Sequence, residues 1–305
     1  MKLPLKGIVP PLITPLKGRD ELDVAGVEKL VEHVLGGGVH GLFLLGSTGE
    51  APGLSYRLRK ELVERVCKQV NGRVPVLVGI TDSSIVEALQ VADCASEAGA
   101  SAVVASTPFY FPAGQEELIG YFEHLSTDLP LPLVLYNMPG FTKTMISTET
   151  VHRLAEDPKI IGIKDSSCDM IHFHRLLLDR PAREDWSMMM GPEELLAESV
   201  LMGANGGVCG GANLAPQLFV DLYNAALNAD VDKIRLLQRQ ALHLGNTLYR
   251  IGKHSSSMIK GIKCTLSLMG ICDDYMADPS TRFHDAERTL IKSRMETPEI
   301  KPLLK

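Results

Sequence analysis

Short apolar runs alternate along the chain with segments in which apolar residues recur every three or four positions. Apolar runs bounded by Gly- or Pro-marked loops are typical of buried parallel strands, and the longer spacing is typical of helices packed on a sheet. The predicted strands are residues 7–14, 41–45, 74–79, 102–105, 131–136, 160–164, 186–190 and 206–209. The predicted helices between them are residues 24–35, 56–70, 84–97, 116–126, 148–155, 170–178 and 193–202.

This alternation predicts the fold class. Each parallel strand pair needs a crossover connection, and eight strand–helix units supply those connections. Because no second cluster of strands follows, we expect an α/β fold closed into a TIM (β/α)8 barrel. An open, doubly wound sheet is the alternative. Asp23, Ser55 and Ser147 precede predicted helices and are expected to cap them.

Further helices are predicted after the eighth strand, at residues 217–227, 231–250 and 256–269. The first completes the barrel, and the others form a C-terminal helical extension. One short helix is expected within the Pro- and charge-rich residues 278–305. We therefore expect a catalytic barrel in residues 1–228 and, in residues 229–305, a helical extension of the same domain.

Composition narrows the class of protein. The 305 residues are 45% hydrophobic and 22% charged, an ordinary globular balance that excludes a disordered or fibrous chain. The net charge of −6 gives no reason to expect nucleic acid or a membrane as a partner. The six cysteines form no CxxC pair, and no apolar run is long enough to span a bilayer. These features predict a cytoplasmic protein with reduced thiols.

Lys164 is the first candidate for chemistry, because functional side chains of barrels follow the C-terminal ends of strands. It ends the apolar run 160–163, so its amine must either reach solvent or lose hydration, which favours the neutral form. A neutral amine in a dry pocket attacks carbonyl groups and forms a Schiff base. An ion pair with Asp165 or Glu193 is the structural alternative.

Other strand ends supply possible helpers. Tyr136 ends the neighbouring strand and could relay protons, or simply cover the core. Ser47 and Thr48 follow a glycine, so their hydroxyl and N–H groups could face one carboxylate; a simple turn is the alternative.

The remaining candidate positions follow strand ends around the same rim and are expected to contact substrate. They are Ser166, Gly191, Glu193, Glu194 and Asn213. No pair of histidines has metal-ligand spacing and no dinucleotide fingerprint is present, so neither metal nor nucleotide is expected.

Together these motifs resemble the dihydrodipicolinate synthase/N-acetylneuraminate lyase family. The resemblance rests on Gly-Ser-Thr-Gly-Glu at residues 46–50, Tyr-Asn-Met-Pro at residues 136–139 and the spacing from there to Lys164. Thr-Pro-Phe-Tyr at residues 107–110 and Gly-Gly-Val at residues 206–208 match as well. It extends over about residues 7–272, nearly the whole chain.

The resemblance implies a class I aldolase or synthase that acts on pyruvate or another 2-oxo acid without a cofactor. It implies that Lys164 forms the imine and that Tyr136 relays the proton. It assigns the substrate carboxylate to Ser47 and Thr48, with the backbone near Val208. It also implies that Tyr110 reaches into a neighbouring subunit's site, in a homotetramer built as a dimer of dimers.

Departures from the family pattern bear on the second substrate. Phe141 stands where the synthases are implied to use an arginine for a second carboxylate, and a phenyl ring makes no such pair. Glu193 and Glu194 resemble an altered form of the acidic pair of the lyases.

We therefore predict an aldolase, similar to N-acetylneuraminate lyase or to 4-hydroxy-2-oxo acid aldolases, that releases pyruvate and a neutral aldehyde. The first alternative is 4-hydroxy-tetrahydrodipicolinate synthase, which condenses pyruvate with aspartate semialdehyde. The second is a barrel that binds a 2-oxo acid without turnover.

Overall fold

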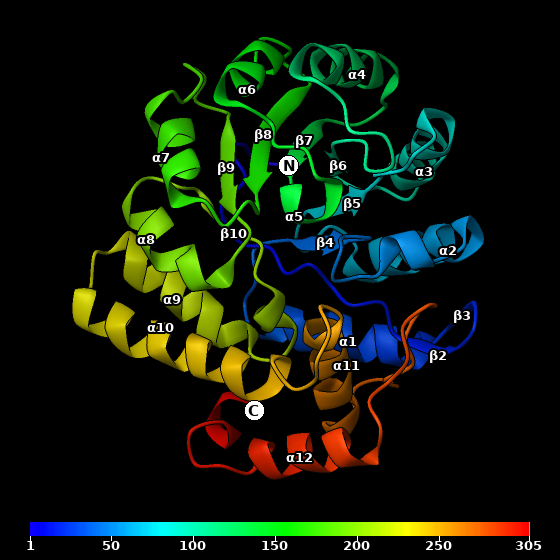
Figure 1. Cartoon of the computed structure of the whole chain (residues 1–305), viewed down its shortest axis with the longest axis vertical. Helices are drawn as coiled ribbons and strands as arrows, with labels where there is room; N and C mark the ends of the chain where they lie inside the picture. Colours follow the sequence, from blue (N-terminus) through cyan, green and yellow to red (C-terminus); the bar gives the residue numbers. More distant parts are fainter. Residues whose placement is uncertain (305) are drawn as a thin grey trace.

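The computed structural model describes residues 1–304 and is built around one sheet of eight parallel strands (Figure 1). All eight lie where the apolar runs predict them. They are β1 (Gly7–Ile8), β4 (Leu42–Leu44), β5 (Val76–Gly79), β6 (Ala102–Ser106), β7 (Leu133–Asn137), β8 (Ile160–Asp165), β9 (Ser187–Met190) and β10 (Gly206–Gly207).

The sheet closes on itself into a barrel. The strand order is β1-β10-β9-β8-β7-β6-β5-β4, and the chain beside β1 meets the chain beside β4. The His40 N–H donates to the Ile8 carbonyl at 2.8 Å, the Phe43 N–H to the Pro10 carbonyl at 2.9 Å, and the Leu12 N–H to the Phe43 carbonyl at 2.9 Å. These bonds leave no open edge between β1 and β4, so the predicted barrel is confirmed and the open-sheet alternative is wrong.

Helices surround the barrel and follow the predicted ranges closely. Asp23, Ser55 and Ser147 cap their helices by accepting from the N–H groups of Gly26, Leu58 and Thr150. The helices are α1 (Val24–Gly36), α2 (Tyr56–Val70), α3 (Ile85–Glu97), α4 (Gln115–Asp128), α6 (Thr148–Leu154), α7 (Met170–Leu178), α8 (Leu196–Leu201) and α9 (Pro216–Leu227), with short 3₁₀ turns η1 (Ala51–Gly53), η2 (Glu193–Leu195) and η3 (Gly210–Asn213).

Two small elements of the structure are not predicted by the sequence pattern. A two-stranded antiparallel hairpin, β2 (Leu16–Gly18) with β3 (Glu21–Leu22), follows the first barrel strand. A single helical turn, α5 (Pro139–Thr142), follows β7. Both are too short to show a period in apolar residues, which explains why the pattern does not reveal them.

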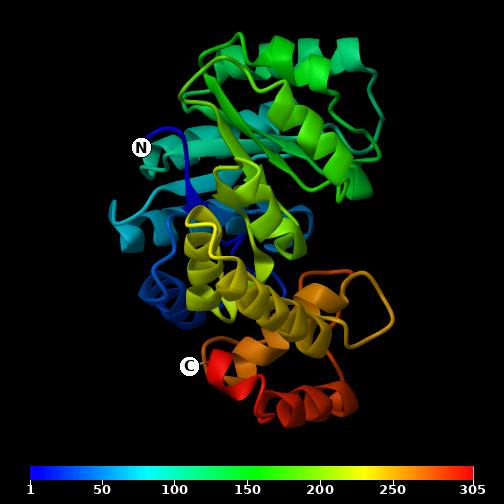
Figure 2. The ribbon, with the colours of Figure 1, turned by 90° about the vertical axis from the view of Figure 1, so that its left-hand side faces the viewer.

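The C-terminal extension packs at one end of the molecule in both views (Figures 1 and 2). It contains α10 (Val231–Leu244), α11 (Ser257–Leu268), α12 (Asp285–Met295) and the 3₁₀ turn η5 (Lys301–Leu304). The helix predicted over 231–250 is α-helical only to Leu244 and continues as one π-helical segment, η4 (Gly245–Tyr249). The predicted boundary after residue 228 falls between α9 and α10.

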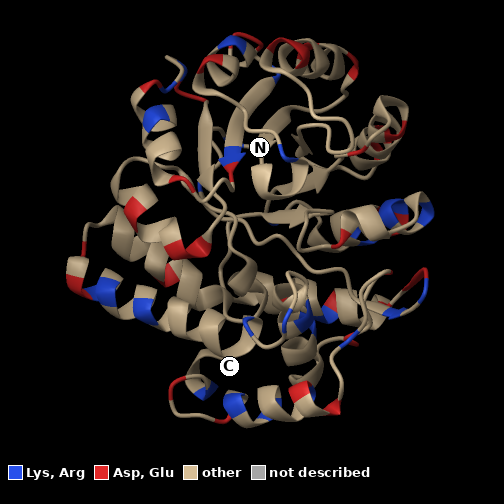
Figure 3. Cartoon of the chain, viewed as in Figure 1, with Lys and Arg blue, Asp and Glu red and all other residues tan. Residues whose placement is uncertain are grey.

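The apolar residues form two separate cores. The larger core lies between the strands and the outer helices, whereas a smaller one contains Val9, Phe43, Val104, Tyr136 and Met189 from alternating strand positions inside the barrel. Charged side chains lie mainly on the outer helices (Figure 3). Within residues 1–304, no helix is both long enough and apolar enough to span a bilayer.

Candidate active site

Lys164 and Tyr136 stand side by side at the C-terminal ends of β8 and β7. The parallel register pairs the two residues directly. Lys164 is only 5% exposed, and its Nζ lies 3.9 Å from the centre of the Tyr136 ring and 5.0 Å from that of Phe43. Within residues 1–304, no carboxylate lies at ion-pair distance from this amine. The alternative prediction, an ion pair of Lys164 with Asp165 or Glu193, is therefore wrong.

The Tyr136 hydroxyl connects the lysine to the loop after β4. It lies 3.4 Å from the Ser47 Oγ. Burial acts to raise the pKa of Tyr136, but the positive charge of Lys164 opposes it. Polar contacts with Ser47, Lys164 and Ser166 act in the same direction as that charge, and the pKa of Tyr136 lies below its ordinary value. A phenol with a lowered pKa beside an amine is suited to proton transfer.

The loop at residues 46–50 forms a tight turn. Ser47 and Thr48 are half-buried at its tip. The Thr14 hydroxyl donates to the Gly49 carbonyl at 2.7 Å, and a Cβ on Gly49 would lie 2.9 Å from the Leu12 carbonyl oxygen. The turn is thus pressed against the chain beside β1, where a larger residue than glycine would not fit.

A cavity of about 320 Å³ opens above Tyr136, within the size range of small-molecule sites. Its walls are mostly apolar, with hydroxyl groups as the polar features and no Asp, Glu, Lys or Arg side chain. The lining residues are Phe43, Leu45, Gly46, Ser47, Ala51, Pro52, Gly79, Thr81, Ser106, Phe109, Tyr136, Met138, Phe141 and Thr142.

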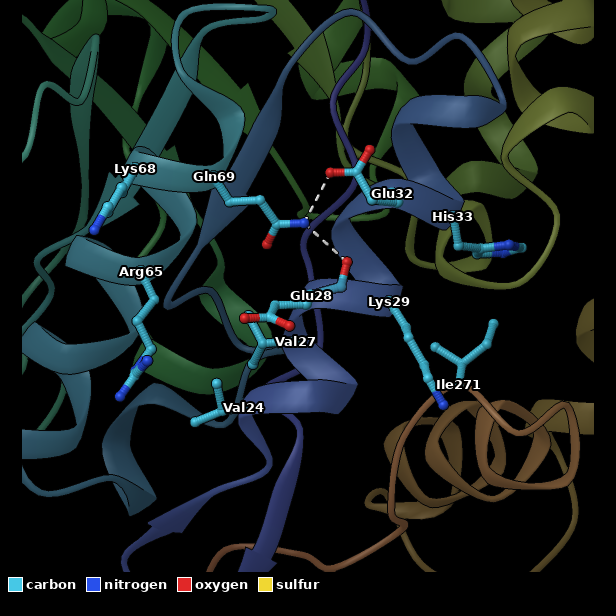
Figure 4. A pocket seen from close by; sticks show the side chains of 10 residues that line it. All are labelled: Val24, Val27, Glu28, Lys29, Glu32, His33, Arg65, Lys68, Gln69 and Ile271. Atoms are coloured by element: carbon cyan, nitrogen blue, oxygen red, sulfur yellow. Dashed lines mark hydrogen bonds between the residues drawn. The ribbon is translucent and has the colours of Figure 1, made fainter.

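A second, larger hollow has a different character (Figure 4). It measures about 950 Å³ and lies over the outer helices α1 and α2, with none of the strand-end residues in its walls. Part of its polar lining is already paired, since the Gln69 amide donates to the Glu28 carbonyl at 2.9 Å and to the Glu32 carboxylate at 2.8 Å. Of the predicted site residues, Ser47, Tyr136 and Phe141 line the smaller cavity, whereas Lys164 does not line it and lies beside the Tyr136 ring.

The two acidic residues that the sequence analysis treats as a pair lie in different surroundings. Glu193 is buried, and its Oε2 accepts from the Gly211 N–H at 2.6 Å. Burial raises the pKa of Glu193 to about 8, although the Gly211 bond acts against it. Glu194 is exposed, 3.7 Å from the Arg250 guanidinium. Neither lines the cavity.

Three further predicted site residues lie around the β8, β9 and β10 ends. A Cβ on Gly191 would lie 1.9 Å from the Ser166 Oγ, so only glycine allows this approach of the two loops. Val208 is buried inside the barrel, and its N–H donates to the Met190 carbonyl at 2.8 Å. Asn213 is fully buried and bonds the backbone at Ile13, Pro11 and Gly210. Its amide is thus used in holding the barrel mouth together.

The aromatic candidates lie at the rim. Phe141 is 58% exposed and contributes to the cavity wall from α5. Tyr110 is 75% exposed beside Phe111, at 5.0 Å between ring centres, and does not line the cavity of its own chain.

A buried polar network that the sequence analysis missed lies behind the Lys164–Tyr136 pair. The Asn137 Nδ2 donates to the Asp165 carboxylate at 2.6 Å, and the Ile146 N–H donates to the Asn137 Oδ1 at 3.0 Å. The Ser167 hydroxyl donates to Asp165 at 2.8 Å, while burial raises the Asp165 pKa. Asn137 and Asp165 directly follow Tyr136 and Lys164, so strand alternation could have placed both on the opposite face.

Within residues 1–304, no group of three or more His, Cys, Asp or Glu side chains is arranged to hold a metal ion. The predicted residues at the strand ends supply an amine, a phenol, hydroxyls and backbone groups. Such a set is suited to imine chemistry with a carbonyl substrate.

Comparison with known proteins agrees with this chemistry. The model of the dihydrodipicolinate synthetase family matches residues 4–297. The chain is 31% identical to 4-hydroxy-tetrahydrodipicolinate synthase of Phenylobacterium zucineum over 292 residues, 95% of this chain and 96% of that protein. It is 30% identical to the synthase of the same name from Methanopyrus kandleri over 301 residues, 97% of each chain.

Solved structures give the same result. The structure of dihydrodipicolinate synthase from Bacteroides thetaiotaomicron is 51% identical, covers 97% of this chain and 99% of its own, and superposes with a TM-score of 0.95. YagE, a prophage protein of the dihydrodipicolinic acid synthase family from Escherichia coli K12 solved with pyruvate, is 28% identical with a TM-score of 0.89, over 96% of this chain and 98% of its own. The chain thus belongs to the dihydrodipicolinate synthetase family, and it is an enzyme of the Schiff-base type that makes or breaks carbon–carbon bonds.

Proposed function

We propose that this chain joins pyruvate to an aldehyde, or releases it from an aldol, through an imine on Lys164. The observation that carries the proposal is the placement of the Lys164 amine, buried without a carboxylate partner and 3.9 Å from the Tyr136 ring centre. The amine adds to the 2-oxo carbon, and the carbinolamine loses water to give the imine. Loss of a proton from the methyl carbon then gives the enamine, the nucleophile that attacks the aldehyde.

Tyr136 is the group we assign to proton relay. Its lowered pKa and its contact with the Ser47 hydroxyl at 3.4 Å support the assignment. The phenol can donate to the carbinolamine oxygen as water leaves and accept the proton back in the next step.

Ser47 and Thr48 are the groups we assign to the substrate carboxylate. Both are half-buried on a tight turn beside Tyr136, and Ser47 lines the cavity. A turn of this kind directs hydroxyl and N–H groups toward one anion. The sequence analysis gave the backbone near Val208 a part in holding the carboxylate, but the Val208 N–H already donates to the Met190 carbonyl. We therefore leave that N–H out of the carboxylate site and assign the buried Val208 side chain to the wall of the barrel interior.

For the second substrate, the names of the relatives support the synthase reaction more than the aldol cleavage favoured by the sequence analysis. Relatives about 30% identical are named 4-hydroxy-tetrahydrodipicolinate synthase, and a structure 51% identical is titled dihydrodipicolinate synthase. Condensation of pyruvate with aspartate semialdehyde is therefore our first candidate reaction.

Phe141 supports a second candidate. It presents an apolar ring to the cavity, and no cationic side chain lines that cavity. A second carboxylate would lose hydration there without gaining an ion pair, which costs several kcal/mol. Cleavage of a hydroxylated 2-oxo acid into pyruvate and a neutral aldehyde avoids this cost.

An assembly of subunits is also proposed. Tyr110 and Phe111 are 75% and 78% exposed in the single chain, and such neighbouring aromatic groups suit an interface. We propose a homotetramer in which Tyr110 completes the site of a neighbouring subunit. The cytoplasmic location and the lack of nucleic-acid and membrane partners stay predictions of the sequence.

Borohydride reduction in the presence of pyruvate tests the shared chemistry. We expect one stable reduced pyruvate adduct on the peptide that carries Lys164, detected by mass spectrometry, and no adduct in Lys164→Ala. A wild-type protein without an adduct at saturating pyruvate contradicts the proposal. Coupled assays of aspartate semialdehyde condensation and of aldol cleavage on one preparation then decide between the two candidates by kcat/KM.

A further inference from the structure

The C-terminal extension reaches the substrate loop through a buried ion pair. Glu50 ends the loop that carries Ser47 and Thr48, and its carboxylate pairs with the amine of Lys263 on α11. The Lys263 residue is fully buried, and the Glu50 side chain is 8% exposed. Buried lysines and glutamates are rare in folded proteins, and those that occur are paired.

Both charged groups are also bonded to a third segment. The Lys263 Nζ donates to the Tyr275 carbonyl at 2.7 Å. The Glu50 Oε2 accepts from the Ala277 N–H at 2.9 Å. The ion pair thus joins the loop after β4, helix α11 and the chain at residues 275–277 at one point.

The backbone of the loop depends on the position of Glu50. Glu50 lies in the left-handed region at φ 56°, which costs a non-glycine residue free energy and requires support from its surroundings. Its N–H donates to the Ser47 carbonyl at 3.1 Å, which closes the turn around Ser47 and Thr48. Movement of Glu50 therefore changes the directions of the two hydroxyls.

Stability alone does not account for such a pair. Taking two charges out of water costs about as much as their attraction returns, and apolar replacements of buried pairs are often neutral. A buried pair does, however, fix one arrangement, because its directional bonds are satisfied in that arrangement only.

We propose that Lys263 is a positioning residue for the oxo-acid carboxylate: through Glu50 it holds the Ser47–Thr48 turn in the geometry that binds substrate. The C-terminal extension thereby takes part in the active site without touching the substrate. This inference rests on the proposed function, since it assigns the turn to the carboxylate of a 2-oxo acid.

The test measures the pyruvate concentration that half-saturates borohydride trapping, read by intact-protein mass spectrometry. The variants are Glu50→Gln, which keeps the side-chain volume, and the double variant Glu50→Gln with Lys263→Met, which leaves no unpaired buried charge. We expect half-saturation to rise about tenfold or more in both, as for a weakened hydrogen bond to a charged group. Trapping at saturating pyruvate should still go to completion.

The matched control removes a different polar contact of the extension. Arg294 on α12 donates to the Thr247 carbonyl at 2.8 Å, a bond that involves none of Glu50, Lys263, Tyr275 and Ala277. Arg294→Met should lower the melting temperature and leave half-saturation unchanged.

A folded variant of the Glu50–Lys263 pair that traps pyruvate with wild-type half-saturation overturns the positioning role, as does an equal rise in Arg294→Met. Failure of the wild type to trap pyruvate at all instead contradicts the proposed function. Should one variant fail to fold, the other decides.

Discussion

Because the carboxyl group of Glu193 is buried, we predict that the free energy of unfolding depends on pH through this residue. Glu193 is 7% exposed and accepts from the Gly211 N–H at 2.6 Å. Burial and, to a smaller extent, the nearby Glu194 raise its pKa from 4.5 to about 8, against the effect of that bond. The folded protein therefore holds a proton on Glu193 at a pH where the unfolded chain has released it.

The sign and the size of the effect follow from proton linkage. Below pH 4.5 both states hold the proton, so the carboxyl makes no difference to the free energy of unfolding. As the pH rises toward the folded pKa of about 8, the unfolded state is favoured by about 1.4 kcal/mol per pH unit, in total about 4–5 kcal/mol. Above that pKa the loss is complete and the curve levels off. Glu193→Gln removes the titration and retains a carbonyl oxygen for the Gly211 N–H.

The assay is urea unfolding of wild type and Glu193→Gln at pH 5, 6, 7 and 8, at one protomer concentration. We expect the stability of the variant relative to wild type to increase steadily over this range. Glu198→Gln on α8 is the matched control, because that side chain is exposed and does not act on the pKa of Glu193, so its substitution should give no such trend. A Glu193→Gln difference that is the same at pH 5 and pH 8 would refute the reasoning, since it would mean that the buried carboxyl is already ionised.

The remaining predictions concern the catalytic chemistry. Tyr136→Phe should slow imine formation by about 10²–10⁴-fold, the range for one acid–base group. Stopped-flow kinetics with pyruvate measures this rate, and an unchanged rate would remove the phenol from the mechanism. Tyr110→Phe should lower turnover only if the subunits associate. We therefore expect wild-type activity to fall on dilution below the dissociation constant of the assembly, in parallel with the molecular mass measured by light scattering. Full activity in a monomer would contradict the role of Tyr110. Phe141→Arg should raise kcat/KM for aspartate semialdehyde by about ten- to hundredfold, which is the gain expected from a charge-assisted hydrogen bond. A lower kcat/KM for aspartate semialdehyde in this variant would count against the placement of its carboxylate beside α5.

The barrel fold and the meeting of Lys164 with Tyr136 could be predicted from the amino-acid sequence. Apolar runs and amphipathic segments differ in period, so each of the eight strands could be located from local pattern alone. Lys164 and Tyr136 both end such runs, and neighbouring parallel strands bring their C-terminal ends to one edge of the sheet. Local spacing and the topology of a barrel were therefore sufficient to predict that these two side chains meet.

The partners of the other polar groups could not be predicted from the sequence and depend on how the chain folds. Glu193 and Glu194 are adjacent in sequence, yet one bonds Gly211 inside the protein and the other lies in solvent near Arg250. Glu50 belongs to a recognisable motif, but its partner Lys263 comes from a helix far along the chain. The apolar period, two residues in a strand and three to four in a helix, specifies which face of an element is buried. An ion pair or a buried hydrogen bond depends instead on how elements far apart in the sequence pack against one another, so a local pattern does not contain it.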